Sequence, residues 1–96
     1  MIGLVAILSI KPGKENEVAE ACRVMAKKVH ELEKDCLFYE PFISEENPRE
    51  IYFLETYADN ESLELHRETE HYKNYREAIK DAVTEPPRVT LLKAIT

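Results

Sequence analysis

Two hydrophobic patterns follow one another in the first third of the chain. Residues 2–10 read IGLVAILSI, an uncharged run rich in β-branched side chains that is typical of a strand buried on both faces. Pro12 and Gly13 then predict a turn. After Glu15 the apolar residues recur every three or four positions, which predicts the buried stripe of an amphipathic helix. The stripe consists of Val18, Cys22, Met25, Val29 and Leu32.

The middle of the chain predicts a β-hairpin. Residues 36–44 (CLFYEPFIS) and 51–57 (IYFLETY) are two strand-like runs separated by a polar turn, EENPRE. Pro41 cannot donate a hydrogen bond to a neighbouring strand, so the first run is bulged or lies at a sheet edge there. In the second run Glu55 shares a face with Phe53 and Tyr57, which places a carboxylate in an aromatic row.

The last part of the chain predicts two helices and a strand. Asp59 or Asn60 can cap a short helix that runs through about Arg67. A longer helix follows, and Pro86-Pro87 ends it. Its apolar stripe is Tyr72, Tyr75, Ile79 and Val83. Residues 88–95 (RVTLLKAI) then predict a final strand.

The resulting order, β-α-β-β-α-α-β, predicts one domain over residues 1–96. Four strands with helices on one side indicate an α+β, ferredoxin-like split βαβ sandwich with a four-stranded antiparallel sheet. The first and last strands carry apolar residues on both faces, although helices can cover only one face. We therefore expect a second copy of the chain to cover the other face, which makes the protein a homodimer.

Charge and composition narrow the choice of partners and compartment. Thirteen basic and nineteen acidic residues, interspersed along the chain, give a formal charge of -6, so nucleic acid is not an expected partner. The longest apolar run, Leu4 to Leu8, is too short to span a bilayer and lacks a signal peptide's charged flank, so we expect no membrane partner and a cytoplasmic location. Cys22 and Cys36 fit neither a disulfide framework nor a metal-site spacing, so no metal is expected.

Three stretches of the chain resemble the antibiotic biosynthesis monooxygenase family of dimeric α+β barrels. They are residues 11–22 (KPGKENEVAEAC), 36–40 (CLFYE) and 52–75 (YFLETYADNESLELHRETEHYKNY). The most specific part is Glu55-x-Tyr57 followed by His66 and His71. The resemblance implies a homodimer in which each protomer holds a pocket between its sheet and its helices.

Members of that family differ in their chemistry. They include cofactor-independent oxygenases of polycyclic phenols, quinol oxidases, haem-degrading enzymes and an isomerase of a phosphorylated autoinducer-2 oxidation product. The haem-degrading branch uses a Trp and an iron-ligating His at two places that correspond in this chain to His66 and Arg76. The chain also has no Trp, so haem is disfavoured. The tail of the pattern, residues 57–75, is similar to the isomerase as well.

Three residues are candidates for catalysis. A neutral imidazole is suited to take a proton from a phenol or an α-hydroxyketone, so either His66 or His71 can be the base. Burial of Glu55 among aromatic residues would raise its carboxyl pKa and can make it a base near neutral pH. With a histidine as the base, Glu55 is the candidate orienting carboxylate. Each also has a purely structural interpretation, in which the histidines cap helices or fill gaps and Glu55 pairs with an arginine across the dimer.

A cluster of aromatic residues is expected to bind the substrate. Its members are Tyr39, Phe53, Tyr57, Tyr72 and Tyr75. Packing in the core is the competing interpretation for each one. The chain has no phosphate loop, dinucleotide fingerprint or metal triad, so we expect no cofactor, and any oxygen chemistry would use the substrate's own electrons.

Three functions are consistent with these residues. The leading one is an oxidoreductase, a cofactor-independent monooxygenase of a small aromatic or quinol-type substrate. The second is an isomerase of a small hydroxyketone, which basic groups such as Arg67, Lys73 and Arg76 near the pocket mouth would favour. The third is a non-catalytic dimer that binds a small ligand, which a cavity too small for a ring would favour.

Overall fold

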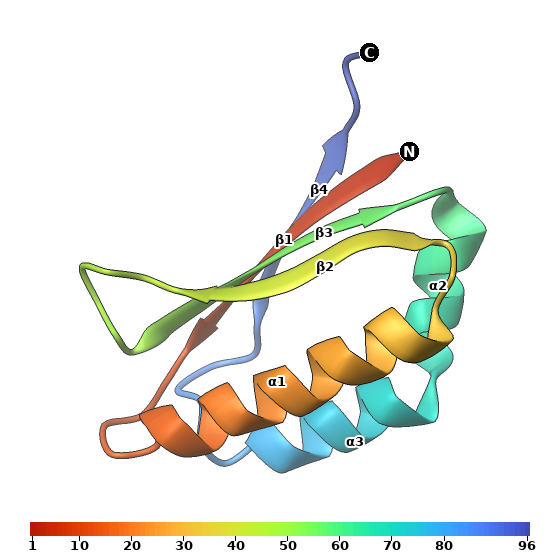
Figure 1. Cartoon of the computed structure of the whole chain (residues 1–96). Coiled ribbons are helices and arrows are strands. Elements are labelled where there is room, and N and C mark those ends of the chain that lie inside the picture. Colours follow the sequence, from red (N-terminus) through yellow and green to blue (C-terminus); the bar gives the residue numbers. More distant parts are fainter.

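The computed structural model describes all residues, 1–96, and has the expected α+β architecture (Figure 1). Its elements are β1 (Ile2–Ser9), α1 (Glu15–Leu32), β2 (Cys36–Ile43), β3 (Glu50–Tyr57), α2 (Asn60–Glu68), α3 (Glu70–Ile79) and β4 (Arg88–Lys93). The strands form one antiparallel sheet in the order β2-β3-β1-β4. The predicted ferredoxin-like fold is confirmed.

The central strand β1 determines which face of the sheet is buried. Leu4 lies opposite Glu55 of β3 on one side and opposite Leu91 of β4 on the other. Leu4, Ala6 and Leu8 are buried, whereas the residues between them are only half-buried. In the single chain β1 is therefore buried on one face only, because α1 and α3 lie on the same side of the sheet (Figure 1), and burial of its other face stays a prediction that needs the second copy.

Helix α1 packs through the predicted stripe, but the stripe is shorter than expected. Cys22, Met25 and Val29 are almost completely buried against the sheet. Leu32, the last predicted member, is 61% exposed. The helix ends there, and the next residue, Glu33, is its C-cap.

Helix α3 ends earlier than the sequence pattern predicts. Its last residue is Ile79, and Val83 instead pairs with Ile10 in an isolated β-bridge. The N–H of Thr84 donates to the carbonyl of Ser9 at 2.8 Å. The backbone after α3 is thus hydrogen-bonded to the end of β1. Val83 is buried, but it lies outside the helix.

Strand β2 lies at a sheet edge, which agrees with the expectation for Pro41. The bulge, however, falls between Cys36 and Phe38, and Pro41 keeps a regular position opposite Phe53. The edge position is sufficient to accommodate a residue that cannot donate to a ladder.

The face of the sheet that points away from the helices is uncovered and carries several exposed apolar side chains among polar ones. Phe38, Phe42, Leu54 and Leu92 lie on this side, because they alternate with the inward-facing residues in the strand register. Between 39% and 48% of each residue is exposed. We call this surface the bare face.

No helix of the protein is long and apolar enough to cross a membrane.

Thr69 joins α2 to α3, and its removal should weaken this junction. Its hydroxyl donates to the carbonyl of His66 at 2.7 Å and accepts from the N–H of Tyr72 at 3.2 Å. We expect Thr69→Ala to lower the free energy of unfolding by about 1–2 kcal/mol, as loss of a helix N-cap does. Thr69→Ser, which keeps the hydroxyl, should lose much less. Urea denaturation measures both, and equal stability of the two variants would contradict the assignment.

Candidate functional site

His66 lies in the last turn of α2 and is enclosed by tyrosines. Its side chain is 3% exposed. The ring centroids of Tyr39, Tyr57 and Tyr72 lie 5.3, 5.3 and 5.2 Å from that of the imidazole. These contacts hold the imidazole plane, so its two nitrogens point in defined directions.

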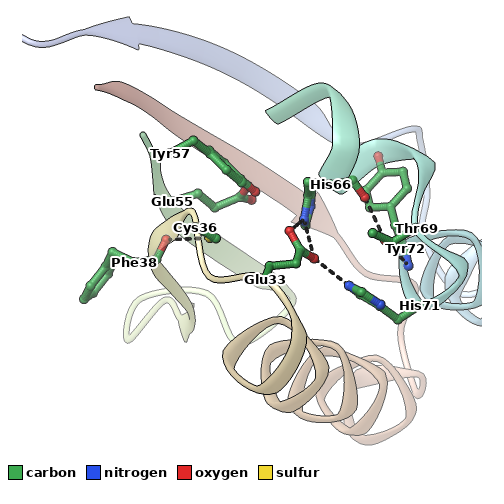
Figure 2. Close-up of polar contacts among 9 residues, drawn as sticks. All are labelled: Glu33, Cys36, Phe38, Glu55, Tyr57, His66, Thr69, His71 and Tyr72. Carbon is green, nitrogen blue, oxygen red and sulfur yellow. Dashed lines mark hydrogen bonds and ion pairs between the residues drawn. The ribbon is translucent and has the colours of Figure 1, made fainter. Parts of the chain in front are cut away.

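Glu33 bridges the two candidate histidines. It follows the last residue of α1, and its carboxylate oxygens lie 2.8 and 3.0 Å from Nδ1 of His66. One of them lies 2.5 Å from Nε2 of His71 (Figure 2). Burial pushes the pKa of Glu33 upwards, but the hydrogen bonds and charges of both histidines outweigh it and hold the pKa below its ordinary value. Glu33 is therefore the ionised partner of both rings.

The role of Glu33 is not apparent from the sequence. It lies between Glu31 and Lys34 at the end of a charged helix, where a solvent-exposed side chain is the ordinary interpretation. Its partners, His66 and His71, are 33 and 38 residues away. The pair of histidines was the only available signal, because imidazoles buried together need an acceptor.

Glu55 is buried in the aromatic row where the sequence placed it. It is 6% exposed, and the hydroxyl of Tyr57 donates to Oε1 at 2.6 Å. Burial raises the pKa of Glu55, and the hydrogen bond from Tyr57 opposes this effect only in part. No arginine of the same chain forms an ion pair with it.

A small cavity lies between the sheet and helices α2 and α3, and most of the predicted site residues line it. These are Tyr39, Phe53, Glu55, His66, Tyr72 and Tyr75. Two others do not. Tyr57 is fully buried behind Glu55, and His71 contacts Glu33 from outside the cavity wall.

Four polar atoms of residues that line the cavity have no hydrogen-bond partner in the chain. They are Nε2 of His66, the second carboxylate oxygen of Glu55 and the hydroxyls of Tyr39 and Tyr75, none of which has a hydrogen bond in the chain. No side-chain nitrogen or oxygen sealed inside the protein lacks a partner. These four atoms therefore keep some accessible surface, and a ligand in the cavity that their residues line can contact them.

The cavity is too small for an aromatic ring as it stands. Its volume is about 40 Å³, whereas a cavity of about 150 Å³ is needed to hold benzene. At its mouth Arg76 donates to the hydroxyl of Tyr72 at 3.1 Å, with the guanidinium carbon 5.9 Å from the ring centroid. Arg67, Pro87 and Val89 complete the mouth, and Lys73 takes no part in it. Entry of a ring requires that Tyr72 or Arg76 move.

Neither cysteine is activated. Burial raises the pKa of Cys22 and of Cys36 to about 12, so both thiols stay protonated near neutral pH. No group of three His, Cys, Asp or Glu side chains is arranged to hold a metal ion. The polar groups available for chemistry are thus the imidazole, the two carboxylates and the tyrosine hydroxyls.

An α+β sheet covered by helices on one face, with an imidazole and a carboxylate among the residues that line a cavity under the helices, defines a small ferredoxin-like protein. The chain matches the family model described as antibiotic biosynthesis monooxygenase over residues 1–78, and it belongs to that family. No curated protein matches the chain.

Solved structures of similar proteins share the whole fold. One from Nitrosomonas europaea, described as a candidate antibiotic biosynthesis monooxygenase, is 22% identical over 100% of both chains, with a TM-score of 0.95. Another with that description, from Caulobacter crescentus, is 29% identical over 99% of this chain and 90% of its own, with a TM-score of 0.93. A third, described as an antibiotic biosynthesis monooxygenase, is 27% identical over 100% of both chains, with a TM-score of 0.92.

The two carboxylates of the site predict opposite effects of pH on stability. The folded-state pKa of Glu33 lies below its ordinary value of 4.5, so its stabilising contribution is present above that value and is lost as pH falls through the folded pKa. The folded-state pKa of Glu55 lies above 4.5, so stability is lost as pH rises through it.

We therefore expect the two Gln variants to diverge as pH rises from about 3 to 6. Glu33→Gln should become progressively less stable than the wild type, by about 1–3 kcal/mol at the upper end, because it loses charged hydrogen bonds. Glu55→Gln should become progressively more stable than the wild type. Denaturant unfolding at a series of pH values measures both, and a shift of both variants in the same direction would contradict the assignment.

Proposed function

We propose that the protein is a cofactor-independent monooxygenase of small aromatic or quinol-type substrates. The observation that carries the proposal is an imidazole that lines a cavity with aromatic side chains, is anchored at one nitrogen by a buried carboxylate and has no partner in the chain at the other. Membership of the antibiotic biosynthesis monooxygenase family supports the same reaction type.

His66 is the base in this proposal. With Glu33 ionised, the tautomer of His66 that acts as a base donates Nδ1–H to that carboxylate and carries its lone pair on Nε2. Nε2 takes the proton of a substrate hydroxyl, and the carboxylate of Glu33 stabilises the imidazolium that forms. His71 holds Glu33 from the other side and does not touch the substrate.

Glu55 and the tyrosines position the substrate. The open oxygen of Glu55 and the hydroxyls of Tyr39 and Tyr75 can hydrogen-bond to substrate oxygens while the rings enclose the substrate and exclude water. The electron-rich phenolate then reacts with dioxygen. In the conversion of a quinol to a hydroxyquinone, the ring gains one oxygen atom, the other leaves as water with two substrate hydrogens, and the substrate supplies all four electrons.

Oxygen uptake by the metal-stripped, flavin-free protein tests this proposal against a panel of quinols and polycyclic phenols. We expect uptake on at least one compound, and a fall of about a hundredfold to ten-thousandfold in kcat for His66→Asn, which is the usual contribution of a general base. His71→Asn is the matched control, because His71 contacts the same carboxylate outside the cavity, and its loss should be much smaller. Unchanged uptake in the His66 variant would overturn the assignment.

The size of the cavity favours a second candidate, a non-catalytic dimer that binds a small ligand. About 40 Å³ accommodates two or three water molecules and no ring. In that case no compound of the panel would be consumed or would bind, and His66 and Glu33 would serve only to join α1 to α2 and α3.

We also propose that the protein is a homodimer built through the bare face. Large apolar side chains exposed together on one side of a sheet are a typical interaction surface, and a twofold axis lets the same patch cover itself. A second copy would bury Phe38, Phe42, Leu54 and Leu92 without any other partner.

Charge placed on the bare face should dissociate this dimer. We expect the wild type to sediment as a dimer and Leu54→Lys to sediment as a monomer at micromolar concentration. Val24→Lys is the matched control, because Val24 is equally apolar, 53% exposed and lies on α1, away from the bare face. A monomeric wild type, or equal dissociation of both variants, would reject the interface.

A further inference from the structure

Two exposed arginines line the cavity, and neither forms an ion pair within the chain. Arg67 belongs to the last turn of α2 and Arg76 to the last turn of α3, and both line the cavity. Neither takes part in an ion pair, although acidic residues outnumber basic residues by nineteen to thirteen. The cavity mouth is therefore a locally positive site on an acidic protein.

The deep end of the same cavity has the opposite character. Glu55 lines it there, and the ionised Glu33 lies directly behind His66. A ligand anion would be repelled by the ionised Glu33 behind His66 and attracted by the guanidinium groups at the mouth. The charges thus define one orientation for an anionic ligand, with its charged group outward and its neutral part inward.

Arg76 is already oriented for such a contact. Its only hydrogen bond in the chain uses Nη1, which donates to the hydroxyl of Tyr72 at 3.1 Å. A guanidinium has five N–H donors in a planar fork, which matches a carboxylate or a phosphate. The donors that Tyr72 does not use are free for a ligand.

We propose that the cavity mouth binds the anionic substituent of an aromatic ligand between Arg67 and Arg76, with the ring directed towards His66. The proposal rests on the proposed function and names its substrate class, a phenol or quinol that carries a carboxylate or phosphate. In this proposal Arg76 turns from the hydroxyl of Tyr72 to the anion, and the released Tyr72 side chain moves to make room for the ring.

Two structural roles compete with this assignment. Arg67 can stabilise the C-terminal end of α2 through the helix dipole, and Arg76 can simply pack against Tyr72. Neither role gives the protein any preference for an anionic ligand. A comparison of matched ligands therefore distinguishes them from an anion site.

Hydroquinone and gentisate, which is hydroquinone with one ring carboxylate, form the matched pair. We measure their binding by titration calorimetry without oxygen, so that no turnover is needed. Gentisate should bind at least about tenfold more tightly, as expected for charged hydrogen bonds. Arg67→Gln and Arg76→Gln should each remove most of this advantage, and Lys73→Gln, an exposed cation on α3 outside the mouth, should retain it.

A second readout avoids variants that fail to fold. In the wild type, gentisate should shift the side-chain NMR signals of Arg67 and Arg76 and leave those of other arginines unchanged, and inorganic phosphate should compete with it. Equal affinity for both ligands, or equal loss in Lys73→Gln, would overturn the proposal. Arginine-dependent binding of gentisate, without oxygen uptake on any compound, would support the anion site and reject the oxygenase. Oxygen uptake on neutral quinols, without arginine-dependent binding of gentisate, would support the oxygenase and reject the anion site.

Discussion

The confinement of all three helices to one face of the sheet determines where the site can form. Leu4, Ala6 and Leu8 of β1 point towards the helices and are buried, and the corresponding positions of β3 include Phe53 and Glu55. Glu55 lies on this face, is 6% exposed and lines the cavity between the sheet and helices α2 and α3. Glu55 is therefore both desolvated and directed into the cavity, which are the two conditions for a carboxyl group with a raised pKa.

Two carboxylates in one site have pKa values displaced in opposite directions, because their neighbours differ. Two imidazoles contact Glu33 and favour its charge, whereas aromatic side chains surround Glu55 and disfavour its charge. Such a pair allows one carboxylate to remain ionised as an anchor while the other can hold or accept a proton. His66 lies between them and connects the anchor to the cavity.

The sequence predicted the helices and strands, and it predicted Glu55 and His66 of the site but not Glu33. The difference lies in how far apart in the sequence the interacting residues are. The aromatic row around Glu55 follows from the alternation of a single strand, and the position of His66 near the sheet follows from its place at the end of α2. The Glu33 bridge depends on how three helices dock, which no local pattern encodes. The same limit explains Val83, whose helix-like spacing was overridden by pairing with Ile10.

The last strand links the site to the state of assembly. Every residue of β4 is exposed and the strand pairs only with β1, so in an isolated chain it is the part of the sheet most prone to local opening. Val89 of this strand forms part of the cavity wall. A second copy that covers β4 would order the wall, and by mass action ligand affinity would then rise with protein concentration. Dilution alone would weaken binding, without any change in the residues that contact the ligand.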